Sequence, residues 1–368
     1  GERSMGAETY WTRLQPRLAT WGITRVADIT GLDRAGLPVA QAIRPLARSN
    51  AANQGKGRTL AHAAIAATLE AIETAVGEHF APGAVVDVTA SQAGVVPACY
   101  SPHLPDEGSA IPPDETLPWL WGVDLDTLEP EPVPAALVST DYTLTSPHMS
   151  SPLARSTTGL GAGASLADAL RHAILEVIER EATGDAMATI DFFELARFNP
   201  ARDADAELAV LIDRLCADGF LIGAYRLPVA APFQGAWVRV MEATHSPLGL
   251  PFPADGFSCR STMGAAVRAA LEEALQTRLS VIAGAREDIT RRFYPRHPPD
   301  NLQTLRDALS APVPGGERVP RDQPAPAGSD ALKALAGHGR RALAVPLLSD
   351  PDVPLHVVRI IPVAVVAP

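Results

Sequence analysis

The sequence predicts an α+β fold in which strands and helices form related, packed layers. Two observations support this prediction. Short stretches of alternating apolar and polar residues, typical of strands, lie before and after three alanine-rich stretches with helical periodicity. This order of strands and helices recurs along the 368 residues without detectable sequence repetition, which favours one α+β domain.

The N-terminal part begins with a predicted strand pair. Residues Ile23 to Ile43 alternate in polarity around a turn at Gly31 to Gly36. A polar segment, Ser49 to Arg58, then leads into a helix from about Leu60 to Gly77, and Thr59 is its expected N-cap. The first alanine-rich stretch is therefore a helix with a defined start.

The middle of the chain is rich in proline. Residues Pro97 to Pro134 are interpreted as a loop-dominated surface or lid with a short strand at Trp119 to Val123, and Ala135 to Tyr142 as another strand. Ser165 and Asp168 then have the spacing of a capping box, which predicts that a second helix starts here and runs to about Thr183.

The C-terminal part alternates again. It contains a predicted helix at Leu208 to Leu215, strands at Phe220 to Val229 and Ala236 to Glu242, a third alanine-rich helix from about Met263 to Ala283, and strands at Ala342 to Pro346 and His356 to Ile361. We expect a single domain over residues 5–368, with residues 295–329 as a long loop or excursion because they are dense in proline, glycine and charge. Residues 1–4 are interpreted as the remnant of an expression tag.

The composition is that of a large globular protein. Hydrophobic residues make up 46% of the chain and charged residues 20%, and the chain is long enough to bury a large core. The net charge of -11 argues against a nucleic-acid partner. The three cysteines have no zinc-like spacing and no apolar run has the length of a membrane span. We therefore expect a cytoplasmic protein that binds neither nucleic acid nor a membrane.

Each alanine-rich helix carries two oxygen-bearing side chains three residues apart. The pairs are Glu70 and Glu73, Glu176 and Glu179, and Glu273 and Gln276. Residues at this spacing share one helix face, and here they occupy positions where the apolar pattern ordinarily places buried side chains. Any one pair is typical of a solvated helix face. Three pairs predict a converging acidic cluster, which must bind cations because unpaired buried carboxylates are unstable.

The ligand chemistry favours magnesium. Five carboxylates and one amide oxygen are hard donors that suit Mg²⁺ rather than zinc or copper, and Mg²⁺ in turn suggests phosphate. A di-iron helix bundle would need a Glu-x-x-His motif, and His172 has the wrong offset from Glu176 for it.

Two glycine-rich motifs precede the first two of these helices. Gly55-Lys56-Gly57 could let an anion approach backbone amides beside a lysine, although it is not a Walker A loop, because position 50 is Asn. Gly159 to Gly163 differs from a dinucleotide fingerprint because a polar, proline-broken segment precedes it. We interpret it as a loop that approaches a nucleotide or phosphate, with a plain tight turn as the alternative.

At these motifs the chain resembles the YcaO family. Residues Ser156 to Ala182, STTGLGAGASLADALRHAILEVIEREA, are similar to the central motif of that family, and Glu272 to Asp288, EEALQTRLSVIAGARED, to its later motif. The spacing from Gly-Lys-Gly to Glu70 and Glu73 also fits. The similarity covers roughly Ile23 to Ile289.

The resemblance implies a YcaO-type fold, with mixed β-sheets and packed helices around a site for ATP and Mg²⁺. It further implies an enzyme that phosphorylates the oxygen of a peptide backbone amide, after which a nucleophile adds to the amide carbon and phosphate leaves. A Cys, Ser or Thr side chain then gives an azoline, an amine gives an amidine, and sulfide gives a thioamide.

The resemblance also assigns roles to individual residues. Glu70, Glu73, Glu176 and Glu179 become ligands of Mg²⁺ and phosphate; Lys56, Arg180 and Arg286 become phosphate contacts; and Asp168, Glu273 and Gln276 become further parts of the nucleotide site. Among these residues, Glu179, Arg180 and Arg286 are the expected catalytic residues.

The chain departs from the family pattern in ways that bear on its subclass. Thr158 and Ala164 replace two asparagines, Asp168 replaces the usual glutamate, and the proline-rich C-terminus of azoline-forming members is absent. No winged-helix domain is recognisable ahead of Ile23. These features predict a divergent, standalone member that matures a ribosomal precursor peptide without a partner protein, as similar bottromycin-pathway enzymes do, giving a thiazoline or a macrocyclic amidine.

Two alternatives and one assembly stay open at this point. The opening around Ile23 also resembles members that work with a TfuA-type partner in thioamidation. The lost asparagines leave room for a peptide-binding scaffold without catalysis. A homodimer is a candidate assembly.

Overall fold

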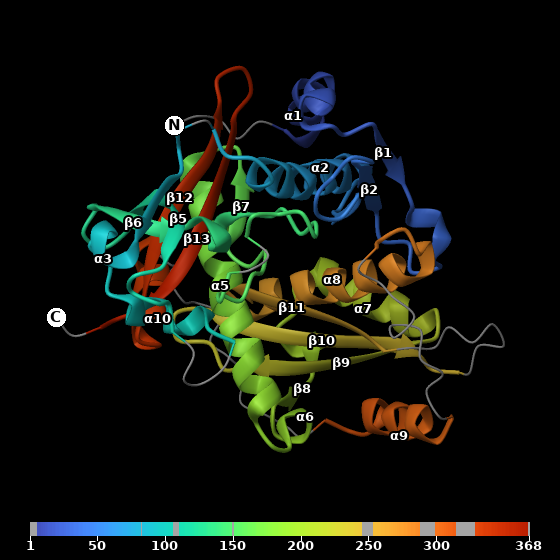
Figure 1. The fold of residues 1–368 in the computed structure, drawn as a ribbon. Helices are drawn as coiled ribbons and strands as arrows, with labels where there is room; N and C mark the ends of the chain where they lie inside the picture. The colour runs from blue at the N-terminus through green and yellow to red at the C-terminus, as the bar shows by residue number, and fades with distance from the viewer. Residues whose placement is uncertain are drawn as a thin grey trace.

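The computed structural model describes residues 6–81, 83–105, 110–148, 151–244, 253–287, 299–313 and 328–366. Within these residues the strands form three sheets, and every pairing is antiparallel. Helices pack between and around the sheets (Figure 1). The α+β prediction is confirmed.

The three sheets are built from segments far apart in the sequence. The three-stranded sheet has the order β1 (Arg25–Asp28), β2 (Val39–Ile43) and β3 (Ala52–Lys56). The four-stranded sheet has the order β11 (Ala254–Arg260), β10 (Gln234–Glu242), β9 (Phe220–Leu227) and β8 (Arg197–Phe198). The largest sheet has the order β4 (Val86–Thr89), β5 (Thr116–Asp124), β12 (Arg340–Asp350), β13 (Leu355–Ala364) and β7 (Leu160–Gly163), and β6 (Pro130–Pro134) pairs with β5. The predicted strand pair after Ile23 is β1 and β2, and the two C-terminal strands are β12 and β13.

The three alanine-rich helices connect these sheets. Helix α2 (Leu60–Gly77) packs on the three-stranded sheet and also contacts β7, and α8 (Met263–Ala283) packs on β10 and β11 and contacts β3. Helix α5 (Leu166–Ala188) contacts β13 of the largest sheet and β11 of the four-stranded sheet. Figure 1 shows α5 running through the middle of the molecule, with α2 and α8 beside it.

Each of these helices follows a strand through a short connection and starts in the same way. The N-cap hydroxyls belong to Thr59, Ser165 and Thr262, and each accepts a hydrogen bond from the backbone N–H three residues later. The two oxygen-bearing residues lie eleven and fourteen residues after the cap in all three helices. The units β3–α2, β7–α5 and β11–α8 therefore place their acidic pairs at equivalent positions.

Glycines in the three strands allow this packing. A Cβ added at Gly55 would lie 2.0 Å from the backbone nitrogen of Ala67 in α2, and one at Gly161 would lie 2.5 Å from the carbonyl oxygen of Ala169 in α5. Gly256 has the same relation to α8. The loop predicted at Gly159 to Gly163 is therefore corrected, because residues 160–163 form a buried strand, and Gly55 and Lys56 likewise belong to the end of strand β3. An approach of either motif to a phosphate stays a prediction.

Other segments differ from the sequence-based expectations. Residues Ala135–Val138 form the short helix α4, whereas the sequence predicts that a strand begins here. The prediction is wrong because a short, continuously apolar run does not distinguish a buried helix from a buried strand. The region expected to be loop-dominated contains β5 and β6. Within the expected long loop, Pro299–Ser310 form helix α9, whose Leu302 and Leu309 pack against aromatic residues of the four-stranded sheet; residues 314–327 lie outside the described residues.

The remaining helical elements are short or peripheral. They are α1 (Ala7–Leu14), α3 (Ala90–Ala93), α6 (Phe192–Leu195), α7 (Ala206–Ala217) and α10 (Gly328–Gly337), with 3₁₀ turns at Gln15–Trp21, Thr30–Leu32, Pro97–His103 and Pro200–Arg202. Across the described part of the chain, no helix combines the length and the apolar character that crossing a bilayer requires.

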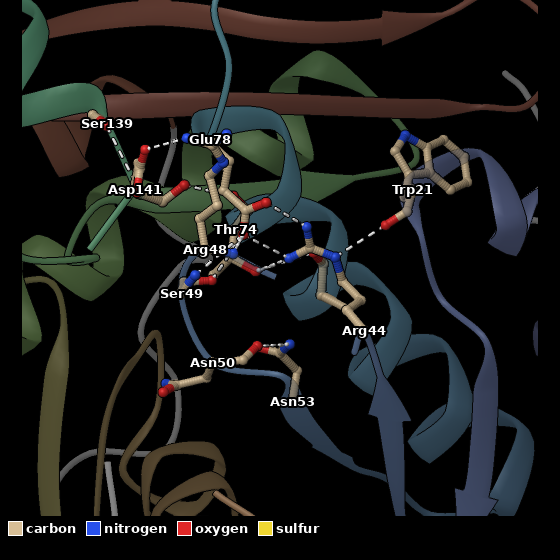
Figure 2. Close-up of polar contacts among 12 residues, drawn as sticks. Trp21, Arg44, Arg48, Ser49, Asn50, Asn53, Thr74, Glu78, Ser139 and Asp141 are labelled. Carbon is tan, nitrogen blue, oxygen red and sulfur yellow. Dashed lines mark hydrogen bonds and ion pairs between the residues drawn. The ribbon is translucent and has the colours of Figure 1, made fainter. Parts of the chain in front are cut away.

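A buried ion pair fixes the C-terminal end of α2 (Figure 2). Arg44 donates from Nη2 to Oε2 of Glu78 at 2.7 Å and from Nε to the carbonyl oxygen of Trp21 at 3.0 Å. Glu78 Oε1 also accepts from the backbone N–H of Arg48 at 2.9 Å and from that of Ser49 at 3.3 Å. This network anchors the connection between β2 and β3 to the helix that carries the first acidic pair.

Candidate nucleotide and magnesium site

Carboxylates from the three alanine-rich helices lie close enough together to influence one another. Burial, followed by the negative charges of Glu176 and Glu70, raises the pKa of Glu73 well above its usual range. Burial, followed by the charge of Glu273, raises the pKa of Glu179 to about 7. Glutamates of α2, α5 and α8 thus share one electrostatic environment, as the spacing of the pairs predicts.

Positive side chains approach this acidic cluster without forming close ion pairs. The distances are 3.8 Å from Lys56 Nζ to Glu273 Oε2, 3.9 Å from Arg180 Nη2 to Glu176 Oε1, and 4.0 Å from Arg286 Nη1 to Glu70 Oε1. All three exceed the length of a charge-assisted hydrogen bond. Burial still raises the pKa of Glu70 to about 7, although the charges of Arg286 and Lys56 lower it. The cations therefore compensate the cluster incompletely.

Backbone amides at and just before strand β7 hold two of the carboxylates in place. The N–H of Ala162 donates to Glu73 Oε1 at 2.6 Å, and the N–H of Gly159 donates to Glu176 Oε2 at 3.1 Å. Strand β7 is at one edge of its sheet, where amides without a strand partner need another acceptor. These two bonds fix α2 and α5 relative to the sheet. Gln276 is fixed similarly, because its Nε2 donates to the carbonyl oxygen of Gln54 in β3 at 3.2 Å.

Protein surrounds these carboxylates, yet a small ligand can reach them. The side chains of Glu70, Glu176 and Glu273 are 39%, 24% and 28% exposed, even though burial raises the pKa of Glu70 and Glu176. Among the described residues, no three His, Cys, Asp or Glu side chains are arranged to hold a metal ion by themselves. This donor set fits Mg²⁺ bound with a nucleotide, since Mg²⁺ typically takes one or two carboxylates and completes its octahedron with phosphates and water.

Asp168 lies apart from these glutamates along α5. It lies eight residues before Glu176, about two turns earlier on α5, and its side chain is 53% exposed. Its Oδ2 accepts a 2.7 Å hydrogen bond from the hydroxyl of Ser165. The structure thus shows the predicted N-cap at Ser165 but not the reciprocal backbone bond of a full capping box, and a nucleotide contact for Asp168 stays a prediction.

Two residues near the cluster were missed by sequence reasoning. Arg260, at the end of β11, lowers the pKa of Glu179, although burial outweighs this effect. On α5, burial together with the charges of Arg260 and Lys56 lowers the pKa of His172. Lys56 and Arg260 each end the strand that precedes an N-capped helix, and this shared position is the signal that could have identified Arg260.

Comparison with known proteins decides the family. Residues 54–362 match the family model described as YcaO cyclodehydratase, ATP- and Mg²⁺-binding. The chain belongs to the YcaO family. ATP and Mg²⁺, the ligands that describe this family, are therefore its cofactors, in agreement with the donor set of the acidic cluster.

Relatives of this YcaO protein occur in several organisms. An uncharacterized protein of Mycobacterium tuberculosis is 31% identical over 293 residues, which is 78% of this chain and 63% of the relative; this chain thus spans less than two thirds of that relative. A protein of Rhizobium leguminosarum bv. trifolii, described as an uncharacterized protein in the tfuA 3′ region, is 27% identical over 98% of this chain and 87% of its own length.

Solved structures share the fold. The structure of YcaO from Methanopyrus kandleri bound with AMPPCP and Mg²⁺ has a TM-score of 0.71 at 21% identity and covers 98% of this chain and 91% of its own. A heterocyclase in complex with substrate and cofactor has a TM-score of 0.73 at 16% identity and covers 98% of this chain and 52% of its own. The YcaO-type fold that the sequence resemblance implies is confirmed.

Proposed function

We propose that this YcaO protein uses ATP to phosphorylate the oxygen of a backbone amide in a ribosomally synthesised precursor peptide. The observation that carries the proposal is the acidic cluster of α2, α5 and α8, whose carboxylates have raised pKa values although cations lie 3.8 to 4.0 Å from three of them. A cluster with this charge deficit is stable when it binds Mg²⁺, and Mg²⁺ brings the phosphates of ATP with it. The family description supports the same cofactors.

The acidic and basic residues of the site have different proposed roles. Glu70 and Glu73 from α2, with Glu176 and Glu179 from α5, are the proposed ligands that hold Mg²⁺ against the phosphates. Mg²⁺ neutralises the charge that develops on the transferred phosphoryl group. Lys56, Arg180 and Arg286, which lie 3.8, 3.9 and 4.0 Å from carboxylates of the cluster, are the proposed phosphate contacts. Glu273 and Gln276 are the proposed contribution of α8 to the nucleotide site.

The proposed reaction has two stages. The amide oxygen attacks the γ-phosphorus, and the bond from that phosphorus to the β–γ bridging oxygen breaks, so that ADP leaves. A side-chain nucleophile of the peptide then adds to the amide carbon and gives up its proton, and the carbon–oxygen bond breaks to release phosphate, which carries the former amide oxygen. A second proton leaves from a nitrogen on the same carbon as the carbon–nitrogen double bond forms. A thiol or hydroxyl nucleophile yields an azoline and an amine yields an amidine. In each case the peptide loses one water, about 18 Da.

The test is a reconstitution with the purified chain, ATP, Mg²⁺ and short peptides encoded beside its gene. We expect peptide-dependent release of ADP and phosphate, and a peptide product lighter by about 18 Da. ATP turnover that no such peptide stimulates, together with retained peptide binding, would instead identify a non-catalytic scaffold.

Thioamidation is the second candidate, because the Rhizobium relative aligned over 98% of this chain is described by its place in a tfuA 3′ region. In that reaction sulfide replaces the amide oxygen, so the peptide gains about 16 Da and the reaction needs a sulfide donor and a TfuA-type partner. Adding sulfide and such a partner to the same assay separates the two products by mass.

A further inference from the structure

Arg359 is a buried arginine whose hydrogen-bonding capacity is mostly unused. It lies in β13, an interior strand of the largest sheet between β12 and β7, and is 3% exposed. Its Nη2 donates to the carbonyl oxygen of Ser156 at 2.8 Å. Its Nε and Nη1 have no hydrogen-bond partner among the described residues. A guanidinium does not give up its proton in a protein, so these N–H groups require an acceptor.

The surroundings of Arg359 point to the acidic cluster. Burial lowers the pKa of Arg359 to about 10, and the charge of Glu176 opposes that shift. Tyr142 lies on the same side, because the centre of its ring packs 4.7 Å from the guanidinium carbon of Arg155, the residue before Ser156. Ser156, which accepts its one hydrogen bond, is three residues before Gly159, whose N–H holds Glu176. Glu176 is therefore the carboxylate of the acidic cluster whose charge acts on Arg359. The hydrogen bond and the ion pair of Glu176 itself are formed with the N–H of Gly159 and with Arg180 rather than with Arg359.

A second buried-strand arginine shows what a purely structural role looks like. Arg341, on the adjacent strand β12, donates to the carboxylates of Asp124 and Glu131. The hydrogen bonds that Arg341 donates to Glu131 raise the pKa of Arg341, whereas burial lowers the pKa of Arg359. Arg341 is thus supplied with anions by the fold, while Arg359 is more deeply buried and has no such carboxylate bonded to it among the described residues.

We propose that Arg359, together with the hydroxyl of Tyr142, forms a subsite for orthophosphate beside Glu176. Phosphate offers several acceptor oxygens, and at this position it can lie between the guanidinium and a Mg²⁺ ion held by Glu176. Tyr142 is 38% exposed and the side chain of Glu176 is 24% exposed, so two of the three groups around the subsite border solvent. The inference rests on the proposed function, in which the departing phosphate is a product that must be held and released separately from ADP.

The experiment measures phosphate binding without any peptide. Sodium phosphate is titrated calorimetrically into the full chain saturated with Mg²⁺ and ADP, and sodium acetate is titrated in a parallel arm. Wild type is compared with Arg359→Met, Arg359→Lys and Tyr142→Phe, and with Arg341→Met as the control for an arginine on the adjacent strand. ADP affinity and thermal denaturation are recorded for each variant.

We expect Arg359→Met to weaken phosphate binding by about tenfold or more, the usual effect of losing a charged hydrogen bond. Arg359→Lys should restore part of the loss, Tyr142→Phe should weaken binding severalfold, and ADP affinity should be unchanged in all three. Arg341→Met should lower the melting temperature and leave phosphate binding intact. Because no peptide is present, failure of peptide modification does not affect this result.

Three results would overturn the proposal. Wild type in the Mg²⁺–ADP state could fail to bind phosphate, it could bind acetate as tightly, or Arg359→Met and Tyr142→Phe could bind phosphate as wild type does. If Arg359→Met does not fold, Arg359→Lys and Tyr142→Phe decide, since both keep the volume of the side chain nearly unchanged.

Discussion

Glu73 on helix α2 and Glu78, the C-cap of that helix, are five residues apart and have opposite surroundings. Glu78 accepts from the guanidinium of Arg44 and from two backbone amides (Figure 2). Glu73 accepts from the N–H of Ala162, and its nearest charged neighbours include Glu70 and Glu176, which raise its pKa further after burial has done so. One carboxylate has its counter-charge within the fold, and the other stands among like charges.

The difference separates a structural ion pair from a binding site. A buried ion pair tolerates desolvation when hydrogen bonds satisfy both partners, as they do for Glu78. Carboxylates gathered without close cations store unfavourable free energy that a bound cation can release. The cluster around Glu73 therefore has the electrostatics of a site that is completed by its ligand.

The largest expected effect is on stability, in a matched pair of substitutions. Glu78→Gln leaves Arg44 buried without its counter-charge and should destabilise the protein by about 3–5 kcal/mol. Glu73→Gln removes repulsion and should leave the free energy of unfolding unchanged or raise it. Urea denaturation without Mg²⁺ measures both. An equal loss of unfolding free energy in the two variants would show that Glu73 is a structural carboxylate like Glu78.

The next effect is on activity. Glu179→Gln removes one charge from the cluster without opening a cavity, so we expect a folded protein whose ATP-dependent product formation falls by about 100-fold, in the range seen when metal sites lose supporting groups. Glu181→Gln is the matched control, because Glu181 is on the same helix but pairs with Arg340 at 3.3 Å. Turnover of Glu179→Gln at the wild-type rate with saturating ATP would remove Glu179 from the ligand set.

These predictions depend on features that the sequence reveals unequally. The pairs on α2, α5 and α8, and the helix starts at Thr59 and Ser165, follow from local periodicity and capping. The strand character of the glycine motifs does not, because Gly55 and Gly161 are required by helices that pack against them, and that contact is tertiary. The environment of Arg359 cannot be predicted from the sequence either, since an arginine in an apolar strand does not reveal whether the fold supplies acceptors for its N–H groups.

The pH dependence of Mg²⁺ binding sharpens the comparison further. The pKa values of Glu70 and Glu179 are about 7, against an ordinary value of 4.5. Because the folded protein holds these two protons more tightly than the unfolded chain, their binding stabilises the ligand-free fold. This stabilisation is complete below pH 4.5 and is lost as the pH rises through 7. Mg²⁺ needs the ionised form, so its affinity should fall by about tenfold per protonated ligand between pH 8 and pH 6.

The measurement must separate these glutamates from the histidines. Burial lowers the pKa of His103 to about 4. Between pH 6.5 and about pH 4, His103 is protonated in the unfolded chain but not in the folded protein, and this difference favours unfolding. Its effect on stability therefore opposes that of the glutamates below pH 6.5. The shift of melting temperature caused by Mg²⁺ should therefore be compared between wild type and Glu70→Gln/Glu179→Gln. A larger shift at pH 8 than at pH 6 in wild type, flattened in the double variant, is the expected result. An equal shift at both pH values would contradict it.

The smallest expected effect marks the boundary of the cluster on α5. Asp168 accepts a hydrogen bond from Ser165 in the first turn, is 53% exposed, and lies about two turns from Glu176. Asp168→Ala should lower stability by about 0.5–1 kcal/mol through the weakened cap and the lost charge at the helix N-terminus. If Asp168 only caps the helix, affinity for Mg²⁺ and a non-hydrolysable ATP analogue should stay within about twofold of wild type, far from the effect of Glu179→Gln. A loss of nucleotide affinity comparable to that of Glu179→Gln would instead confirm Asp168 as the nucleotide contact that the family resemblance predicts, and would show that the site extends from the acidic cluster to the start of α5.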